Sequence, residues 1–129
     1  MSPRAVPLPG GPWRVAVAEW SMAPALEPGD WLITDPRVRD WPPPGAVVLL
    51  REPGSGELVV KRVVARAPAT VATEFGPMPL DEGEAWVEGD AAASHDSRHY
   101  GPVPRDRLVA RVVIRYWPPR RAGRVGGAR

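Results

Sequence analysis

AVVLLREPGSGELVVKRVVA, residues 46–65, is the stretch of sequence that decides the fold. Two apolar runs rich in Val, residues 46–51 and 58–65, flank residues 52–56, a segment that contains Pro and two Gly. β-branched residues favour extended backbone, whereas Pro and Gly end strands and form turns. The stretch therefore predicts two antiparallel strands joined by a turn, that is, a β-hairpin.

Shorter strands are expected on both sides of this hairpin. The chain holds 18 Pro and 13 Gly, which interrupt every helical period and favour short strands joined by turns. Residues 67–84 are expected to form a loop, because they are rich in Ala, Pro and Thr and poor in large apolar side chains. The predicted strands are residues 13–20, 31–34, 85–88 and 108–117. The composition thus predicts a mainly β fold without a long helix.

A length of 129 residues suits one hydrophobic core, so we expect a single domain over residues 1–129. The core is expected at about residues 13–117, with flexible tails at 1–12 and 118–129, where no apolar pattern favours docking. The chain contains no Cys, which excludes disulfides and thiolate metal sites.

Membrane-spanning and secretory segments are not expected. No apolar run approaches the roughly 20 residues that cross a bilayer, and Met1 to Pro12 lacks the apolar centre of a secretory signal. The chain is therefore expected to be cytoplasmic and to have no transmembrane segment, with peripheral contact with a membrane as the alternative.

The formal net charge of +2 is unevenly distributed. Residues 1–114 hold 12 basic and 15 acidic side chains, whereas residues 115–129 hold five Arg and no acidic residue. A terminus of this kind is typical of a solvated tail rather than of a nucleic-acid surface. We therefore expect no nucleic-acid partner, and the basic tail is assigned no function.

Lys61 stands out because the chain has 16 Arg and only one Lys. Arg stays protonated in proteins, whereas a buried Lys can lose its proton and act as a base. The two-residue period of a strand places Lys61 on the same face as Val59 and Val63, with Arg62 on the other face. Lys61 is therefore either a general base or a lysine that extends from an edge strand to solvent.

A neutral lysine needs a nucleophile, and Ser21 is the best placed of the five Ser residues. It follows the predicted strand at residues 13–20, where a bend stiffened by Pro24 exposes its hydroxyl and backbone N–H. Ser21 is thus either the nucleophile of a Ser/Lys pair or an ordinary turn residue.

Six sequence blocks in fixed order connect the chain to a known family. They are SMAPAL at 21–26, GD at 29–30, GAVV at 45–48, VVKRVV at 59–64, GD at 89–90 and SHDSRHYGPVP at 94–104. Together these blocks closely resemble the signal peptidase I family of serine peptidases over about residues 15–115. The resemblance implies a domain of coiled antiparallel sheets and a serine endopeptidase that uses a Ser/Lys dyad without a metal or cofactor.

The resemblance also implies the roles of the central residues. Ser21 matches the nucleophile of the family, and Lys61 matches the general base. Ser94 matches a serine that donates or accepts a hydrogen bond at the lysine and orients it.

Four further residues match supporting positions. Asp96 and Arg98 match an ion pair that shapes the loop carrying the orienting serine. Met22 and Pro24 match residues that pack beside the nucleophile. None of these four is implied to be catalytic.

Four positions depart from the family pattern. Glu19 stands two residues before Ser21, where the family has Gly or a Ser whose hydroxyl can help to hold the oxyanion. A carboxylate cannot donate such a hydrogen bond, and the loss of one donor typically costs about 10²–10³ in rate. The other departures are Ala25 for Thr, Ala46 for Asp and Ala91 for Asn.

Within the family, this chain resembles the short members without an anchor, such as the maturation peptidases of nickel superoxide dismutase. These enzymes remove a leader from a cytoplasmic precursor. The resemblance implies a precursor protein bound as an extended peptide, with small side chains before the cut. Two alternatives are a processing peptidase with another substrate and a signal peptidase that acts on secretory precursors with a membrane partner.

Other chemistries stay open at this point. His95, Asp96 and His99 would suit a Ser/His/Asp triad or a metal site, although such neighbours in a turn-rich loop are more often solvated. Self-cleaving repressors share Ser/Lys chemistry, but no helix-turn-helix motif precedes Ser21. A catalytically weak peptide-binding domain is the non-enzymatic alternative, favoured by Glu19 and opposed by Lys61.

Overall fold

The predicted hairpin lies at the centre of the structure. Strand β4, Val47–Arg51, pairs antiparallel with the longer strand β5, Leu58–Arg66. A backbone hydrogen bond of 2.8 Å from Glu52 N to Glu57 O closes the turn between them. Both strands of the hairpin then serve as partners for the rest of the sheet.

The computed structural model describes residues 4–7 and 13–126, and residues 4–7 by their backbone alone. Within these residues, nine strands form one antiparallel sheet in the order β1-β2-β3-β10-β4-β5-β8-β9, with β11 paired to β10. The other strands of this sheet are β1 Arg4–Pro7, β2 Trp13–Ala16, β3 Trp31–Asp35, β8 Glu84–Glu88, β9 Val103–Pro104, β10 Leu108–Trp117 and β11 Gly123–Arg124. The predicted mainly β fold with antiparallel strands is confirmed.

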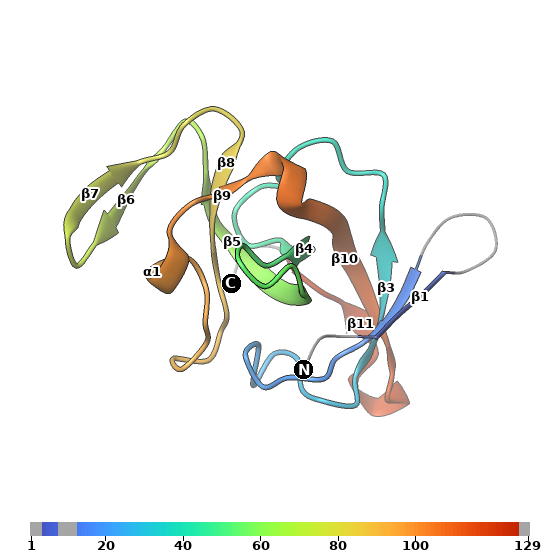
Figure 1. The fold of residues 1–129 in the computed structure, drawn as a ribbon. Helices are drawn as coiled ribbons and strands as arrows, with labels where there is room; N and C mark the ends of the chain where they lie inside the picture. The colour runs from blue at the N-terminus through green and yellow to red at the C-terminus, as the bar shows by residue number, and fades with distance from the viewer. Residues whose placement is uncertain (1–3, 8–12, 127–129) are drawn as a thin grey trace.

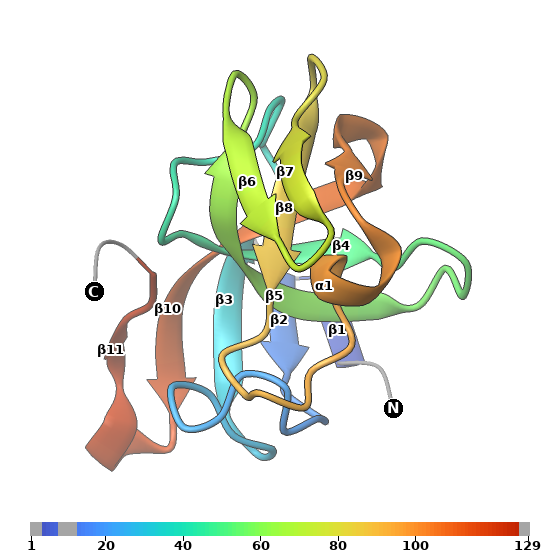
Figure 2. The ribbon, with the colours of Figure 1, turned by 90° about the vertical axis from the view of Figure 1, so that its left-hand side faces the viewer.

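The sheet is curled, as Figures 1 and 2 show, and β10 joins its two halves. This strand pairs with β3 on one side and with β4 on the other, and its register shifts three times along these two edges. Such irregularities bend a strand and increase its twist. The curl closes the two halves around a shared interior, in agreement with the expected coiled sheet.

Strand β4 is buried on both faces, which explains why its sequence is apolar without alternation. Val47 and Leu49 pack into one group of buried residues, the first cluster, and Val48 and Leu50 pack into another, the second cluster. The first cluster comprises Val15, Val17, Met22, Leu26, Leu32, Val47, Leu49, Val60, Ala110 and Val112. The second cluster comprises Trp41, Val48, Leu50, Val59, Val63, Ala85, Val87 and Val103.

The expectation of a loop at residues 67–84 is wrong. Strands β6, Thr70–Thr73, and β7, Gly76–Pro79, form a separate two-stranded hairpin that projects from the body of the molecule (Figure 1). The Thr73 hydroxyl donates a hydrogen bond of 2.7 Å to the carbonyl of Gly76, whose φ of +110° reverses the chain. A low apolar density hid this hairpin because its side chains are largely exposed.

The C-terminal stretch differs from the expected flexible tail over residues 118–126. It forms a 3₁₀ turn at Pro119–Arg121, and β11 then returns along β10. Val125 donates a backbone hydrogen bond of 3.0 Å to Val113 and packs against the first cluster. The apolar side chain of Val125 and the strand pairing hold the stretch in place. The sequence did not predict this docking, because an Arg-rich composition is typical of a solvated tail.

The N-terminal expectation is corrected in part, because β1 pairs with β2 at the edge of the sheet. Residues 1–3, 8–12 and 127–129, which also belong to the predicted tails, lie outside the described residues.

Helices are short throughout the described ranges. They are α1, Ser97–Tyr100, and 3₁₀ turns at Arg105–Arg107 and Pro119–Arg121. In the part of the chain that the structure covers, no helix has the length and apolar character needed to cross a membrane.

Candidate active site

Lys61 lies deep in strand β5 and is only 1% exposed. Its Nζ donates a hydrogen bond of 2.9 Å to Oγ of Ser94. Val59 and Val63, which precede and follow it by two residues, are buried in the second cluster. The lysine is thus held in an apolar environment in which a hydroxyl supplies a polar contact.

Burial lowers the pKa of the Lys61 amine, because the ammonium form loses hydration that apolar neighbours do not replace. The negative charges of Glu19 and Asp96 oppose this effect and act to raise the pKa, but they do not cancel it. The amine is therefore easier to deprotonate than that of an exposed lysine.

Ser21 lies in the segment between β2, which ends at Ala16, and β3, and we call residues 21–30 of this segment the Ser21 loop. Met22 and Leu26 are each 1% exposed and anchor this Ser21 loop in the first cluster. A backbone hydrogen bond of 2.9 Å from Leu26 N to Met22 O closes a turn between these anchors. Ser21 itself is half-buried, so the residue is partly accessible from solvent.

A small pocket of about 10 Å³ opens beside Ser21. A space of this size holds about one water molecule. The lining residues are Val17, Ala18, Glu19, Ser21, Met22 and Val60. Four of the six are apolar, so the pocket suits a small uncharged group.

Three segments of the chain converge on Gly89, directly after β8. A Cβ atom at this position would lie 2.1 Å from Oγ of Ser94 and 2.4 Å from the carbonyl oxygen of Ser21. The same carbonyl accepts a hydrogen bond of 2.9 Å from Ala91 N. Because residue 89 has no side chain, the Ser21 backbone can approach the hydroxyl that binds Lys61.

Asp96 is fully buried and holds the loop of residues 89–96 in shape. Its carboxylate accepts hydrogen bonds from the Gly89 backbone N at 2.8 Å and from two guanidinium nitrogens of Arg98 at 2.6 and 2.9 Å. Burial alone would raise the pKa of the Asp96 carboxyl, but the hydrogen bonds from Arg98 and Gly89 hold it below the usual value. The pair fixes the loop that carries Ser94.

The structure brings most of the predicted site residues together. Across residues 13–126, however, Lys61 donates its hydrogen bond to Ser94 and makes none with Ser21. Catalytic hydrogen bonds are often long without substrate and tighten in the complex. Met22 lines the pocket, whereas Pro24 is exposed and lies outside the lining, so it does not pack there as expected.

Two contributors were not singled out from the sequence. Val60 lines the Ser21 pocket from β5, although alternation places it opposite Lys61. Arg62 forms a two-pronged ion pair with Asp90, at 2.9 and 2.8 Å, and so ties β5 to the 89–96 loop. An Arg beside the lysine and an Asp after Gly89 were the available signs of this pair.

The two histidines do not form a triad with Ser21. His95 and His99 are exposed, and their ring centroids lie 4.8 Å apart. Nδ1 of His99 accepts a bond of 3.4 Å from the Asp96 backbone N. Over the described ranges, neither ring is hydrogen-bonded to Ser21 or to the Asp96 carboxylate.

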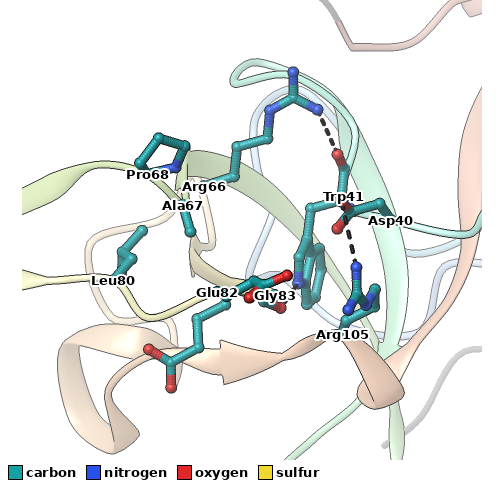
Figure 3. A pocket seen from close by; sticks show the side chains of 10 residues that line it. Asp40, Trp41, Arg66, Ala67, Pro68, Leu80, Glu82, Gly83 and Arg105 are labelled. Atoms are coloured by element: carbon teal, nitrogen blue, oxygen red, sulfur yellow. Dashed lines mark hydrogen bonds and ion pairs between the residues drawn. The ribbon is translucent and has the colours of Figure 1, made fainter.

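A much larger pocket of about 530 Å³ lies over Trp41, near the end of β5 and the start of β8 (Figure 3). Both of its arginines have partners within the pocket lining: Arg66 donates to the Trp41 carbonyl at 2.6 Å, and Arg105 lies 3.5 Å from Asp40. It shares no lining residue with the Ser21 pocket. Size alone does not make it the candidate active site.

Comparison with known proteins identifies the family of this chain. The family profile described as "Signal peptidase, peptidase S26" matches residues 13–78 and 73–117, most of the chain. The chain belongs to this signal peptidase family. Ser/Lys chemistry is typical of its members, and the family supports the predicted serine endopeptidase class.

Relatives of this signal peptidase domain include mitochondrial and bacterial proteins. Mitochondrial inner membrane protease subunit 2 of Schizosaccharomyces pombe is 36% identical over 116 residues, covering 81% of this chain and 64% of the relative. Signal peptidase I of Leptolyngbya laminosa is 29% identical over 140 positions, covering 82% and 69%. Mitochondrial ATP-independent inner membrane protease subunit 1a of Arabidopsis thaliana is 34% identical, covering 58% and 51%. The chain thus spans about half to two thirds of the length of these relatives.

Lys61→Met should change how the stability of this signal peptidase domain depends on pH. The folded lysine pKa is lowered, so between that pKa and the unfolded value of 10.5 the unfolded state binds more protons. The free energy of unfolding of the wild type, minus that of Lys61→Met, should therefore rise with pH in this window and level off above 10.5. Urea titrations at a series of pH values measure this difference.

The difference between the two proteins isolates the titration of Lys61, because every other titrating group is present in both and Lys61 is the only lysine. A difference that stays constant from neutral pH to above 10.5 would show that Lys61 titrates as a solvated amine.

Proposed function

We propose that this domain is a serine endopeptidase in which Ser21 is the nucleophile and Lys61, in its neutral form, is the general base. The observation that supports this most is the burial of the only lysine, at 1% exposure, with a hydrogen bond to Ser94. A lysine kept for its positive charge would gain nothing from a site that opposes ionisation. A lysine used as a base needs such a site.

Acylation would follow from these groups. Oγ of Ser21 attacks the carbonyl carbon of the scissile peptide bond while Nζ of Lys61 accepts the hydroxyl proton. The resulting ammonium then gives its proton to the leaving amine, and an ester to Ser21 remains. Water hydrolyses this ester in the second half of the cycle, with Lys61 again as the base.

Ser94 would orient the base. A neutral amine has two N–H donors and one lone pair, and the hydrogen bond to Ser94 occupies one donor at 2.9 Å. With Lys61 held by its carbon chain in β5, this contact restricts the rotation of the amine. Asp96 and Arg98 would support the dyad indirectly by fixing the loop that carries Ser94.

The oxyanion would depend on the backbone at Ser21. Within the described residues, the Ser21 backbone N–H is not used in a hydrogen bond, so it is available to the carbonyl oxygen of a bound peptide. Glu19 lines the same pocket with a carboxylate, which cannot donate when it is ionised. With one donor fewer than family members that have Ser at this position, the enzyme should turn over about 10²–10³ times more slowly than those members.

The substrate would bind as an added strand beside β5. This strand pairs with β4 from Leu58 to Arg62, but its pairing with β8 begins only at Arg62. Over the described ranges, the second edge of β5 is thus unpaired just before Lys61. An extended peptide placed there gains backbone hydrogen bonds next to the proposed base.

The natural substrate is proposed to be a precursor protein from which a leader or propeptide is removed. A nickel superoxide dismutase precursor in the cytoplasm is the first candidate that we put forward. The names of the relatives favour a second candidate, a precursor processed at a membrane together with a partner subunit. Cleavage of each purified precursor, with and without membranes, separates the two.

Ser21→Ala, Lys61→Ala and Lys61→Arg should each lower kcat/KM by at least about 10³-fold, because a nucleophile or a base is lost. Lys61→Arg should be as damaging as Lys61→Ala, since a guanidinium cannot accept a proton at usable pH. Mass spectrometry of a cleaved peptide library gives the rates. Ser55→Ala, at an exposed hairpin turn, is the matched control and should keep wild-type activity.

Substantial activity in Lys61→Arg would exclude Lys61 as the base. Binding of peptides without any cleavage that depends on Ser21 would favour a peptide-binding domain instead.

Cleavage should follow small residues, Ala or Gly. The pocket beside Ser21 has a volume of about 10 Å³ and walls formed by Val17, Met22 and Val60, so larger side chains would clash. The same library, read for the residue before each cut, measures this preference. A preference for aromatic or basic residues there would contradict the proposed pocket.

A further inference from the structure

Two arginines of the C-terminal stretch reach the loop that carries Ser21. We infer that Arg121, assisted by Arg115, is a positioning residue that holds the Ser21 loop, residues 21–30, in its reactive shape. This inference rests on the proposed function, because it assigns to the C-terminal turn the task of fixing the nucleophile. It concerns residues that composition marked as a solvated tail.

Arg121 binds the loop through four contacts. Its Nη1 pairs with Glu27 at 2.5 Å and with Asp30 at 3.1 Å. Its Nη2 donates to the backbone carbonyls of Pro24 at 3.2 Å and Ala25 at 3.3 Å. One guanidinium therefore joins both the middle and the end of the loop, which a single side-chain hydrogen bond cannot do.

Arg115 reinforces this arrangement from strand β10. Its Nη1 donates to the Ala25 carbonyl at 2.6 Å and lies 3.3 Å from the Asp30 carboxylate. Its Nε donates to the carbonyl of Arg121 at 2.5 Å, so the two arginines are also linked to each other. Asp30, only 2% exposed, receives both guanidinium groups.

The charges of this group balance, with two arginines against Glu27 and Asp30. Asp30 also accepts a hydrogen bond of 3.0 Å from the backbone N of Glu27, which closes the loop on itself. A buried carboxylate with these partners has a strongly preferred geometry. The loop is thus fixed by polar contacts on one side and by the apolar anchors Met22 and Leu26 on the other.

The arginines themselves are held by the sheet. The 3₁₀ turn at Pro119–Arg121 follows β10 directly, and β11 pairs back with Ile114 and Arg115. A Cβ atom at Gly126 would lie 3.1 Å from Val47 N, so the chain beyond β11 lies close against β4. The loop is therefore positioned by the same sheet that carries Lys61, because β10 pairs with β4 and β4 pairs with β5.

The test compares Arg121→Gln and Arg121→Lys with Arg124→Gln. Arg121→Gln should lower kcat about 10- to 100-fold with KM nearly unchanged, because a displaced nucleophile slows chemistry rather than peptide binding. Arg121→Lys should restore part of the loss, since an ammonium keeps the charge but cannot make all four contacts. Arg124 is exposed, and Arg124→Gln should match the wild type.

Amide hydrogen exchange supplies a readout that does not need activity. Arg121→Gln should speed exchange at residues 21–30 and leave the β4–β5 hairpin protected, whereas general unfolding would speed both. Glu27→Gln keeps both arginines on Asp30 and should give a smaller change in the same loop, even if Arg121→Gln folds poorly.

Wild-type kcat and wild-type exchange in Arg121→Gln would overturn the inference. If the wild type shows no cleavage that depends on Ser21, the proposed function fails. Faster exchange in Arg121→Gln that is confined to residues 21–30 would then still support the role of Arg121 in holding this loop.

Discussion

The candidate site is built around a primary amine that is buried between apolar strands. Lys61 sits in the middle of β5 at 1% exposure, where water cannot stabilise its charge. The hydroxyl of Ser94 is its hydrogen-bond partner, and burial shifts the pKa of the amine downward. The surrounding fold excludes water from this amine and holds it against Ser94. The curled sheet covers both faces of the β4–β5 hairpin, and Gly89 lets the Ser94 hydroxyl approach.

Ion pairs then hold the loops that the sheet leaves irregular. Arg98 and Asp96 fix the 89–96 loop, and Arg62 ties the same loop to β5 through Asp90. Arg121 and Arg115 do the same for the Ser21 loop. Each pair joins a guanidinium to a carboxylate that is nearly buried, where such contacts are well defined. This use of Arg for structure fits a chain that keeps one Lys, at the position that we propose for the general base.

The central hairpin, the mainly β class and the hydrogen bond between Lys61 and Ser94 could be predicted because each rests on a local pattern or on a short motif. The catalytic roles of Ser21 and Lys61 stay predictions. The β6–β7 hairpin could not be predicted, since it is small, exposed and poor in large apolar residues. The docking of residues 118–126 was missed for a related reason: five Arg suggested solvent, but the acidic partners of Arg121, Glu27 and Asp30, lie about 90 positions earlier in the chain. Ion pairs between residues so far apart in the chain produce no pattern in the local sequence.

The protonation state of Lys61 decides whether this residue can act as the base, and the chain offers a direct way to measure it. With only one lysine, a protein labelled with ¹³C at lysine Cε gives one side-chain signal to follow by NMR as the pH is raised. The proposed role of Lys61 as the base predicts a titration midpoint below the usual lysine value of 10.5, because burial disfavours the ammonium. A midpoint at or above 10.5 would contradict it, since Lys61 would then hold its proton and could not serve as the base.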